Sequence, residues 1–542
     1  MNPITFEVVK NRLLAIAEEM ENSLMRSAYS PGVKEMRDCS CSLFDAGGQV
    51  VAQAAALPMH LGALTPAVEY LLQRHPPSTM AEGDLFITNE PSQGGTHLQD
   101  FILILPIFWQ QRVVAFAVNL AHQVDIGGMA PGSGPGDATE IFQEGIRIPC
   151  LKLYAAGQPN ETAFAFISLN VRSPELTLGD VRAQTSACKI GAERVSELLS
   201  RYGAETVAEC MAGMLDYSER LIRQAIERTP DGRYVAEDFI DDDGIDLGQP
   251  IPIRASVEIR GDRVLIDFEG SAPMVRGAIN CPYSSTFAAA MYATTGAFGA
   301  DVPNNAGCYR PVTLRVPTGS ILHAVPPAAV NARAVASRRA ADVLIRCLSE
   351  AVPERAIAGS SDNTFVVQIS GRRTAGNDYF HYIEALGGGL GARRDRDGVD
   401  GIDTHTTNNM NVPIEAMELN APLLVERFEL IADSGGAGRW RGGLGFRKQI
   451  RVLQPATLGV RADRFVHPAP GFAGGAPGGR ASCELNGRPL GSKKSLIRLA
   501  GGDVVTVCTA GGGGFGDPAS RPDAARREDE RNGRVSPAGA AR

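Results

Sequence analysis

The chain has 542 residues, more than one ordinary core accommodates, and this length predicts roughly two to four domains. Its 53 Lys and Arg against 61 Asp and Glu give a formal net charge of −8, and no basic stripe runs among aromatic residues, which argues against a nucleic-acid partner. The amino terminus lacks the order of a signal peptide, and no apolar run approaches the ~20 residues that span a bilayer. We therefore expect a soluble, cytoplasmic chain without membrane contact, with its 10 scattered Cys as reduced thiols.

The amino-terminal residues predict a helix, a hairpin and a second helix. Asn2 and Pro3 are typical of a helix start, and apolar residues at steps of three and four continue it to about residue 28, at Val9, Leu13, Ile16, Met20 and Leu24. Residues 41–53 favour a hairpin that turns at residues 45–48, and residues 64–73 favour a helix.

A longer hairpin is predicted by residues 94–128, which read GGTHLQDFILILPIFWQQRVVAFAVNLAHQVDIGG. Strand-forming residues at 101–109 and 113–120 flank a short polar turn at 110–112. With the turn centred near Gln111, the numbers of opposed residues in an antiparallel pair sum to about 222.

Two His/Asp pairs lie at the open end of this hairpin. That register sets Asp100 opposite His122 and His97 opposite Asp125, at ~4.5–5.5 Å. One such pair in a loop is more often a simple hydrogen bond, but two pairs brought together in a chain with only 8 His favour a metal site. Imidazole and carboxylate without thiolate suit a divalent ion such as Zn, Mn or Fe, and three protein ligands leave a position for water or substrate.

Four further residues are candidates for the same site. Asp38 could supply a fourth metal ligand or a carboxylate that supports the ligands, against the alternative of a solvated charged loop. His60 could line the cleft, although a lone His is more often a core residue. Glu140 and Glu144 are four residues apart, so a helical turn would put both carboxylates on one face, as acid or base candidates or as ordinary solvated glutamates.

The remaining chain predicts helices and then strands. Residues 181–228 favour two helices that break at Tyr202 and Gly203, and residues 253–268 alternate in polarity around a turn at Gly261 and Asp262. Glycine-dense stretches at 434–445 and 511–518 lack the spacing of nucleotide loops and are interpreted as tight turns where backbone passes close to backbone.

The predicted fold class is therefore α+β and multi-domain, with hairpin-rich mixed sheets and packed helices. Residues 1–230 form an α+β region that carries the metal hairpin, and residues 231–518 form a mainly β region with inserted helices. Residues 519–542 contain almost no large apolar side chain and are expected to be a disordered tail.

Taken in order, several motifs resemble those of the hydantoinase B/oxoprolinase family: RSAYSPGVKEMRDCSCSLFD, GGTHLQDF, AHQVDIGG, PGSGPGDATEIFQEGIRIP, NVRSPELTLGD, NNAGCYRPV, SGGAGRWRGGLG and GGGGFGDP. The resemblance extends from the amino terminus to about residue 518. The family includes B subunits of ATP-dependent N-methylhydantoinases, part of 5-oxoprolinases, lactamases for larger rings, and large subunits of acetone and acetophenone carboxylases. One departure is Gln123, where the common AHHxD motif has a second histidine.

The resemblance implies a metal site and a partner. The residues that hold a divalent metal in the carboxylase relatives fall on His97, Asp100 and His122. In this family ATP is bound by a separate actin-like A subunit, which phosphorylates the substrate. The chain is therefore expected to act in a hetero-oligomer and to use ATP through that partner.

The function implied is that of the B subunit of an ATP-dependent cyclic-amide hydrolase of the hydantoinase or 5-oxoprolinase type. Water would attack the activated ring, with Asp125, Glu140 or Glu144 moving protons. The alternatives are a subunit of an ATP-dependent ketone carboxylase, and a non-catalytic scaffold for the A subunit.

Overall fold

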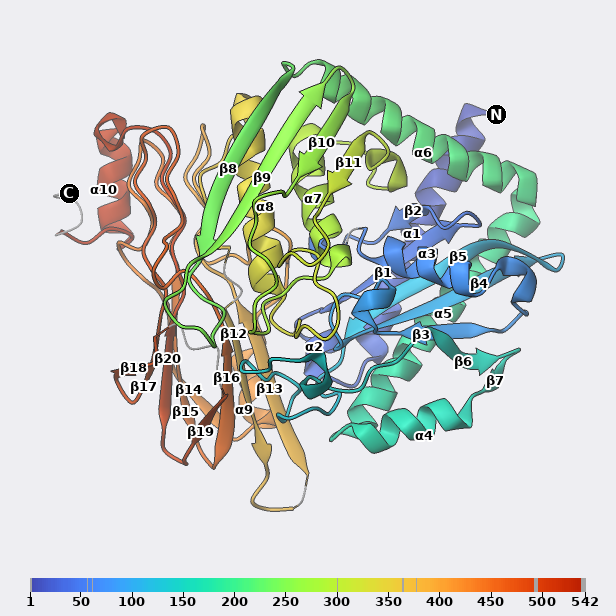
Figure 1. The fold of residues 1–542 in the computed structure, drawn as a ribbon, viewed down its shortest axis with the longest axis horizontal. Helices are drawn as coiled ribbons and strands as arrows, with labels where there is room; N and C mark the ends of the chain where they lie inside the picture. The colour runs from blue at the N-terminus through green and yellow to red at the C-terminus, as the bar shows by residue number, and fades with distance from the viewer. Residues whose placement is uncertain are drawn as a thin grey trace.

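The protein combines helices with four β-sheets, which confirms the α+β class (Figure 1). The computed structural model describes residues 2–55, 57–60, 62–299, 301–362, 365–376, 378–491 and 496–537. Among these residues no helix has the length and hydrophobicity needed to cross a bilayer. All 10 cysteines are free thiols, as expected.

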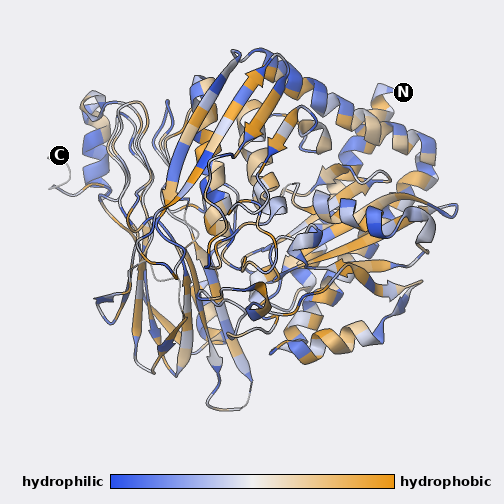
Figure 2. Ribbon diagram, in the orientation of Figure 1, coloured by the Kyte–Doolittle hydropathy of each residue, from blue (hydrophilic) through white to orange (hydrophobic). Residues whose placement is uncertain are grey.

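The amino-terminal sheet is antiparallel and has seven strands in the order β2-β1-β5-β4-β3-β6-β7. Its strands are β1 (Cys39–Asp45), β2 (Val50–Gln53), β3 (Leu85–Thr88), β4 (Asp100–Trp109), β5 (Arg112–His122), β6 (Leu151–Ala155) and β7 (Gln158–Pro159). The longest strands, β4 and β5, are almost entirely buried because helices cover both faces. Figure 2 shows these two strands as largely hydrophobic.

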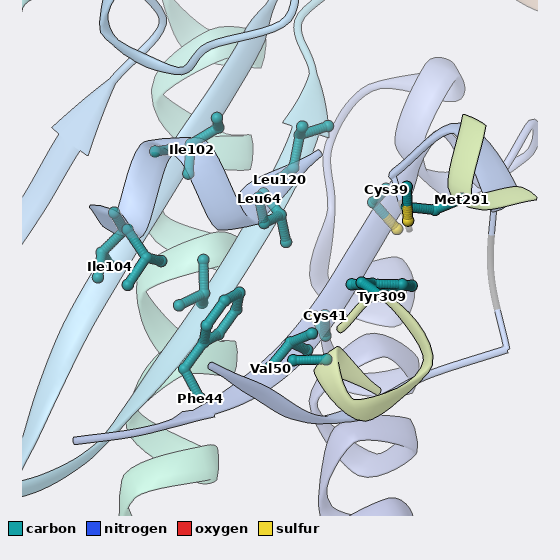
Figure 3. Close-up of a cluster of buried hydrophobic side chains, with 14 of the residues drawn as sticks. Cys39, Cys41, Phe44, Val50, Leu64, Ile102, Ile104, Leu120, Met291 and Tyr309 are labelled. Carbon is teal, nitrogen blue, oxygen red and sulfur yellow. The ribbon is translucent and has the colours of Figure 1, made fainter. Parts of the chain in front are cut away.

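Helices cover this sheet as the apolar periodicity predicts. The predicted first helix is α1 (Pro3–Ser27), capped by the Asn2 side chain, and all five predicted apolar positions are buried. It packs with α5 (Pro174–Tyr202) on one face, while α3 (Leu64–Arg74) lies on the other, where Leu64 meets Ile102 and Leu120 (Figure 3). The other helices of this region are α2 (Pro31–Lys34), α4 (Glu161–Asn170) and α6 (Ala204–Glu227).

A second sheet follows, in the order β11-β10-β9-β8. Its strands are β8 (Gly232–Ile240), β9 (Ile251–Arg260), β10 (Arg263–Asp267) and β11 (Val312–Arg315), and the predicted 253–268 hairpin is β9 with β10. The mostly buried helix α8 (Ala334–Ala351) packs on β8 and β9, and the mostly buried helix α7 (Tyr283–Phe298) packs on α8. One hydrophobic cluster runs through both sheets, from residue 9 to residue 352, so the expected division at residue 230 does not coincide with a boundary between cores.

The carboxy-terminal sheets enclose a second hydrophobic cluster, formed by residues 365–510 together with Met36. One sheet has the order β13-β12-β16-β19 and comprises β12 (Phe365–Arg372), β13 (Tyr379–Leu386), β16 (Ala456–Arg461) and β19 (Leu496–Leu499). The other has the order β14-β15-β20-β17-β18, with β14 (Leu423–Leu430), β15 (Phe446–Val452), β17 (Ser482–Leu485), β18 (Arg488–Pro489), β20 (Val504–Cys508) and the neighbouring helix α9 (Ile414–Asn420).

The glycine-dense stretches pack as predicted. A Cβ at Gly442 would collide with the Gly512 carbonyl, and one at Gly512 would collide with the Leu390 carbonyl. Only glycine allows this approach of backbone to backbone.

The tail corrects a prediction. Instead of disorder from residue 519, the structure has helix α10 (Asp523–Arg531), in which Asp529 is buried. The Asp529 carboxylate accepts from Arg521 at 2.6 Å and lies 3.6 Å from Arg441. Ion pairs hold this segment, and apolar content alone does not reveal them.

Candidate metal centre

The central hairpin forms in the predicted register. Strands β4 and β5 are joined by Gln110 and Gln111, with φ of 49° and 65°, and an irregularity between Ile107 and Phe108 shifts the register by one residue, so that Asp100 pairs with His122. Two positive φ values in a two-residue turn match the twist of the flanking strands. The register therefore brings Asp100 and His122 to the same end of the sheet.

His97, Asp100 and His122 form a buried cluster at this end. His97 Nδ1 lies 2.8 Å from Asp100 Oδ2, and His122 Nδ1 lies 3.3 Å from Asp100 Oδ1. One ligand atom from each residue lies within 4.8 Å of the others, so the three can hold one metal ion. All three are at most 8% exposed. Two imidazoles and a carboxylate fit Zn, Mn or Fe.

The protonation states of the clustered residues suit metal binding. Arg333 Nη2 donates to Asp100 Oδ2 at 2.7 Å, and the Thr96 hydroxyl donates to the same oxygen. Burial alone would raise the pKa of Asp100, but His97 and Arg333 hold it well below its usual value. Burial, with Arg333, lowers the pKa of His97 to about 3. A neutral imidazole and an ionised carboxylate are the protonation states that bind metals.

The cluster faces a cavity of about 70 Å³ between the two cores. This volume is enough for several water molecules or one small polar group. Its lining comes from both hydrophobic cores and comprises Met36, Asp38, Met59, His60, His97, Asp100, His122, Asn331, Ala332, Arg333, Ala334, Val335, Val366, Ile383, Ala385, Thr407, Asn409 and Arg461.

Asp38, predicted as a metal ligand or a carboxylate that supports the ligands, and His60, predicted to line the cleft, both line this cavity. Asp38 is half-buried, and its carbonyl accepts from the His122 amide at 3.0 Å, but its carboxylate is not one of the three clustered ligands. His60 is 2% exposed, and its Nδ1 lies 2.8 Å from the Ser40 hydroxyl. Burial lowers the pKa of His60, so the ring is neutral near pH 7.

Asp125 does not join the cluster, and its expected position opposite His97 is wrong. Its carboxylate accepts from the amides of Gly127 at 2.9 Å and Gly132 at 2.8 Å, and from Arg172 at 3.1 Å. Strand β5 ends at His122, and Asp125 then satisfies the backbone of the glycine-rich loop. The hairpin register therefore does not continue beyond the strand end.

Glu140 and Glu144 do not share a face. They flank a single 3₁₀ turn, η4 (Ile141–Gln143), rather than an α-helical turn, which leaves Glu140 exposed and Glu144 fully buried. Glu144 Oε1 accepts from the amides of Val330 at 2.8 Å and Asn331 at 2.7 Å, while its Oε2 has no partner among the described residues. Burial raises the pKa of Glu144 to about 8. Neither glutamate lines the cavity, and Glu144 instead anchors the segment that leads to Arg333.

Arg333, Asn331 and Arg461 line the cavity but were not predicted from the sequence. The signal for Asn331 and Arg333 is that they are polar residues just before helix α8. Arg461, at the end of strand β16, has no such signal. Gln123, the departure from the family motif, is fully buried and donates to Gln184 Oε1 at 3.3 Å, away from the cavity lining. Its replacement of a histidine therefore leaves the three-residue cluster intact.

Comparisons with known proteins identify the family of the chain. Residues 2–518 match the sequence model of the family Hydantoinase B/oxoprolinase. The B subunit of a putative D-/L-hydantoinase from Pseudomonas sp. (strain NS671) is 31% identical over 541 residues, covering 96% of this chain and 91% of that protein.

Two solved structures are also similar. The ATP-dependent caprolactamase from Pseudomonas jessenii superposes with a TM-score of 0.92 at 31% identity, covering 100% of this chain and 95% of that one. A nucleotide-free acetone carboxylase superposes with a TM-score of 0.91 at 21% identity, covering 100% of this chain and 79% of that one, which shows the fold alone.

Proposed function

Because the chain belongs to the hydantoinase B/oxoprolinase family, we propose that it is the metal-binding subunit of an ATP-dependent enzyme that opens the ring C–N bond of a cyclic amide. The observation that carries this proposal is the buried cluster of His97, Asp100 and His122, which faces a cavity between two cores. The hydantoinase and the caprolactamase, each 31% identical to this chain, are both named for cyclic-amide substrates.

The residues of the chain have distinct tasks in this reaction. His97, Asp100 and His122 hold the metal, and Arg333 fixes the orientation of Asp100. A bound divalent ion such as Zn, Mn or Fe supplies Lewis-acid chemistry and makes water more acidic. The predicted acid and base candidates Asp125, Glu140 and Glu144 do not line the cavity, whereas Asp38, predicted as a metal ligand or supporting carboxylate, does. We therefore assign proton transfer to Asp38.

In the proposed reaction a partner subunit binds ATP. The hydantoinase relative is named as one subunit of its enzyme, which supports a hetero-oligomer with an ATP-binding, actin-like A subunit. The glycine-dense stretches of this chain pack against other backbone, and a Cβ at Gly511 would collide with the Ser434 carbonyl. The substrate would be phosphorylated on the partner and opened at the metal centre.

Elemental analysis of the purified chain tests the site. The wild type should contain near-stoichiometric metal, and His97→Ala and His122→Ala should lose it while circular dichroism shows a retained fold. His75→Ala, a half-buried histidine outside the cavity lining, is the matched control and should keep its metal. Equal metal in all four proteins, or none after metal is supplied, would overturn the proposed centre.

Turnover with the partner then separates the activities. ATP-dependent ring opening of hydantoins or lactams supports the hydrolase. ATP turnover that requires bicarbonate and a ketone would show a carboxylase instead. Full activity of His97→Ala in the reconstituted enzyme would show that this chain is a scaffold.

A further inference from the structure

A second buried arginine, Arg461, lines the cavity from the carboxy-terminal core. It is the last residue of β16 and is 6% exposed. Its Nη1 donates to the Asn331 carbonyl at 3.3 Å and to the Asn331 side-chain oxygen, and its Nη2 donates to Gln368 Oε1 at 3.4 Å. These neutral acceptors hold the guanidinium in place but do not neutralise its charge.

No carboxylate within the described part of the chain forms an ion pair with Arg461. Against the effect of burial, the carboxyl group that raises the pKa of Arg461 is Glu144, whose own pKa of about 8 leaves it largely protonated at neutral pH. A buried cation without a counter-charge is unfavourable, so an anion in the adjoining space would be stabilised strongly.

Arg333 adds a second guanidinium to the same lining. One of its nitrogens, Nη2, pairs with Asp100, but Nε is buried without a hydrogen-bond partner among the described residues. Arg461 and Arg333 therefore place two cations beside one cavity, whose lining contains the carboxylates of Asp38 and Asp100. With a divalent ion at the cluster, the cavity carries a net positive charge.

We propose that Arg461, with Arg333, forms an anion subsite that receives an oxyanion group of the substrate beside the metal cluster. The oxyanion group is either the phosphoryl group of an activated amide or a carboxylate of the substrate, since the planar donors of arginine match both. This inference rests on the proposed function, which requires a phosphorylated substrate to reach this chain. Because Arg461 belongs to the carboxy-terminal core and Arg333 to the amino-terminal one, the bound anion links the two cores.

Titration calorimetry with inorganic phosphate and, separately, with acetate tests the subsite. The full chain is used after chelation, so that neither anion can bind through the metal. Arg461→Gln should weaken anion binding by about 10- to 100-fold, the loss expected for charge-assisted hydrogen bonds, and Arg461→Lys should restore part of it. Arg498→Gln, at an exposed arginine on the neighbouring strand β19, is the matched control and should bind as the wild type does.

The two anions distinguish the source of the group. Arg461-dependent binding of phosphate but not acetate assigns a phosphoryl group, and the reverse assigns a carboxylate. Binding that Arg461→Gln leaves unchanged, or no binding of either anion to the wild type, overturns the inference. Metal content, measured on the same variants before chelation, should stay at the wild-type level, so loss of the subsite is distinguishable from loss of the metal centre.

Discussion

Two buried polar clusters meet at helix α8, and they differ in how completely their charges are paired. The metal cluster consists of His97, Asp100 and His122 with Arg333, the residue before the helix. The ion-pair network consists of Arg339 and Arg464 with four aspartates, at positions 238, 342, 362 and 463. Both clusters are buried, so burial alone does not separate a site from a structural element.

In the ion-pair network each arginine and each aspartate forms an ion pair with a residue of opposite charge. Arg339 lies 2.6 Å from Asp362 and 2.7 Å from Asp463, and Arg464 lies 2.8 Å from Asp362. Burial alone would lower the pKa of Arg339, but these carboxylates hold it above its usual value. The metal cluster instead contains a neutral imidazole and faces a cavity. Open space beside converging lone pairs distinguishes the candidate metal cluster from the ion-pair network.

The largest expected effect is on the ion-pair network. Arg464→Met should lower the free energy of unfolding by about 3–5 kcal/mol, because it leaves buried aspartates without their partner. Urea denaturation measures the loss, and metal content per folded molecule should not change. Arg480→Met, at an exposed arginine, should alter stability by less than about 0.5 kcal/mol. A similarly small change for Arg464→Met would contradict a structural role for the network.

Glu144 should make stability depend on pH. Its pKa rises from 4.5 unfolded to about 8 folded, so its contribution is fully present below pH 4.5 and is lost as pH rises through 8. Glu144→Gln mimics the protonated carboxyl. Between pH 5 and 8.5 its free energy of unfolding should therefore decline by roughly 2–4 kcal/mol less than that of the wild type. Urea denaturation across this range checks the slope, and Glu140→Gln, at the exposed neighbour, should follow the wild type. Parallel curves for Glu144→Gln and wild type would refute the assignment.

Local patterns predicted much of the fold. Apolar steps of three and four located α1, and a symmetric turn gave the register that pairs Asp100 with His122. These features depend on neighbours in sequence, where periodicity reports burial directly. The position of Asp125 was wrong because β5 ends at His122, and nothing in the apolar pattern marks that end.

Long-range contacts account for what the sequence did not predict. Arg333 reaches His97 across 236 residues, and Arg461 contacts Asn331 across 130. Neither pairing leaves a periodic trace, because each joins segments that are far apart in the sequence. The tail helix was missed for a related reason, since Asp529 is buried by arginines at positions 441 and 521 rather than by apolar residues.

Metal removal should destabilise the metal cluster while leaving the ion-pair network intact. At a free metal concentration 100 times Kd, binding stabilises the native state by about 2.7 kcal/mol. Thermal unfolding of the metal-loaded chain should therefore occur at a higher temperature than that of the chelated chain. His97→Ala should abolish this difference, and His75→Ala should keep it. A metal-dependent shift that persists in His97→Ala would locate the ion elsewhere.

The smallest expected change in metal affinity is that of Asp38→Asn, and it decides whether Asp38 is a metal ligand. Its carboxylate lies outside the three-residue cluster, and its contact with His122 runs through its own carbonyl, which Asp38→Asn preserves. Removing a side chain that hydrogen-bonds a metal ligand typically costs roughly 10–100-fold in metal affinity. Because the Asp38 side chain makes no such bond among the described residues, Asp38→Asn should weaken metal binding by less than about 10-fold. Competition with a fluorescent chelator measures the affinity. Turnover should nevertheless fall by about 100-fold or more, because the variant cannot accept a proton. A larger loss of affinity than of turnover would make Asp38 the fourth ligand and leave proton transfer to another residue at the cavity wall.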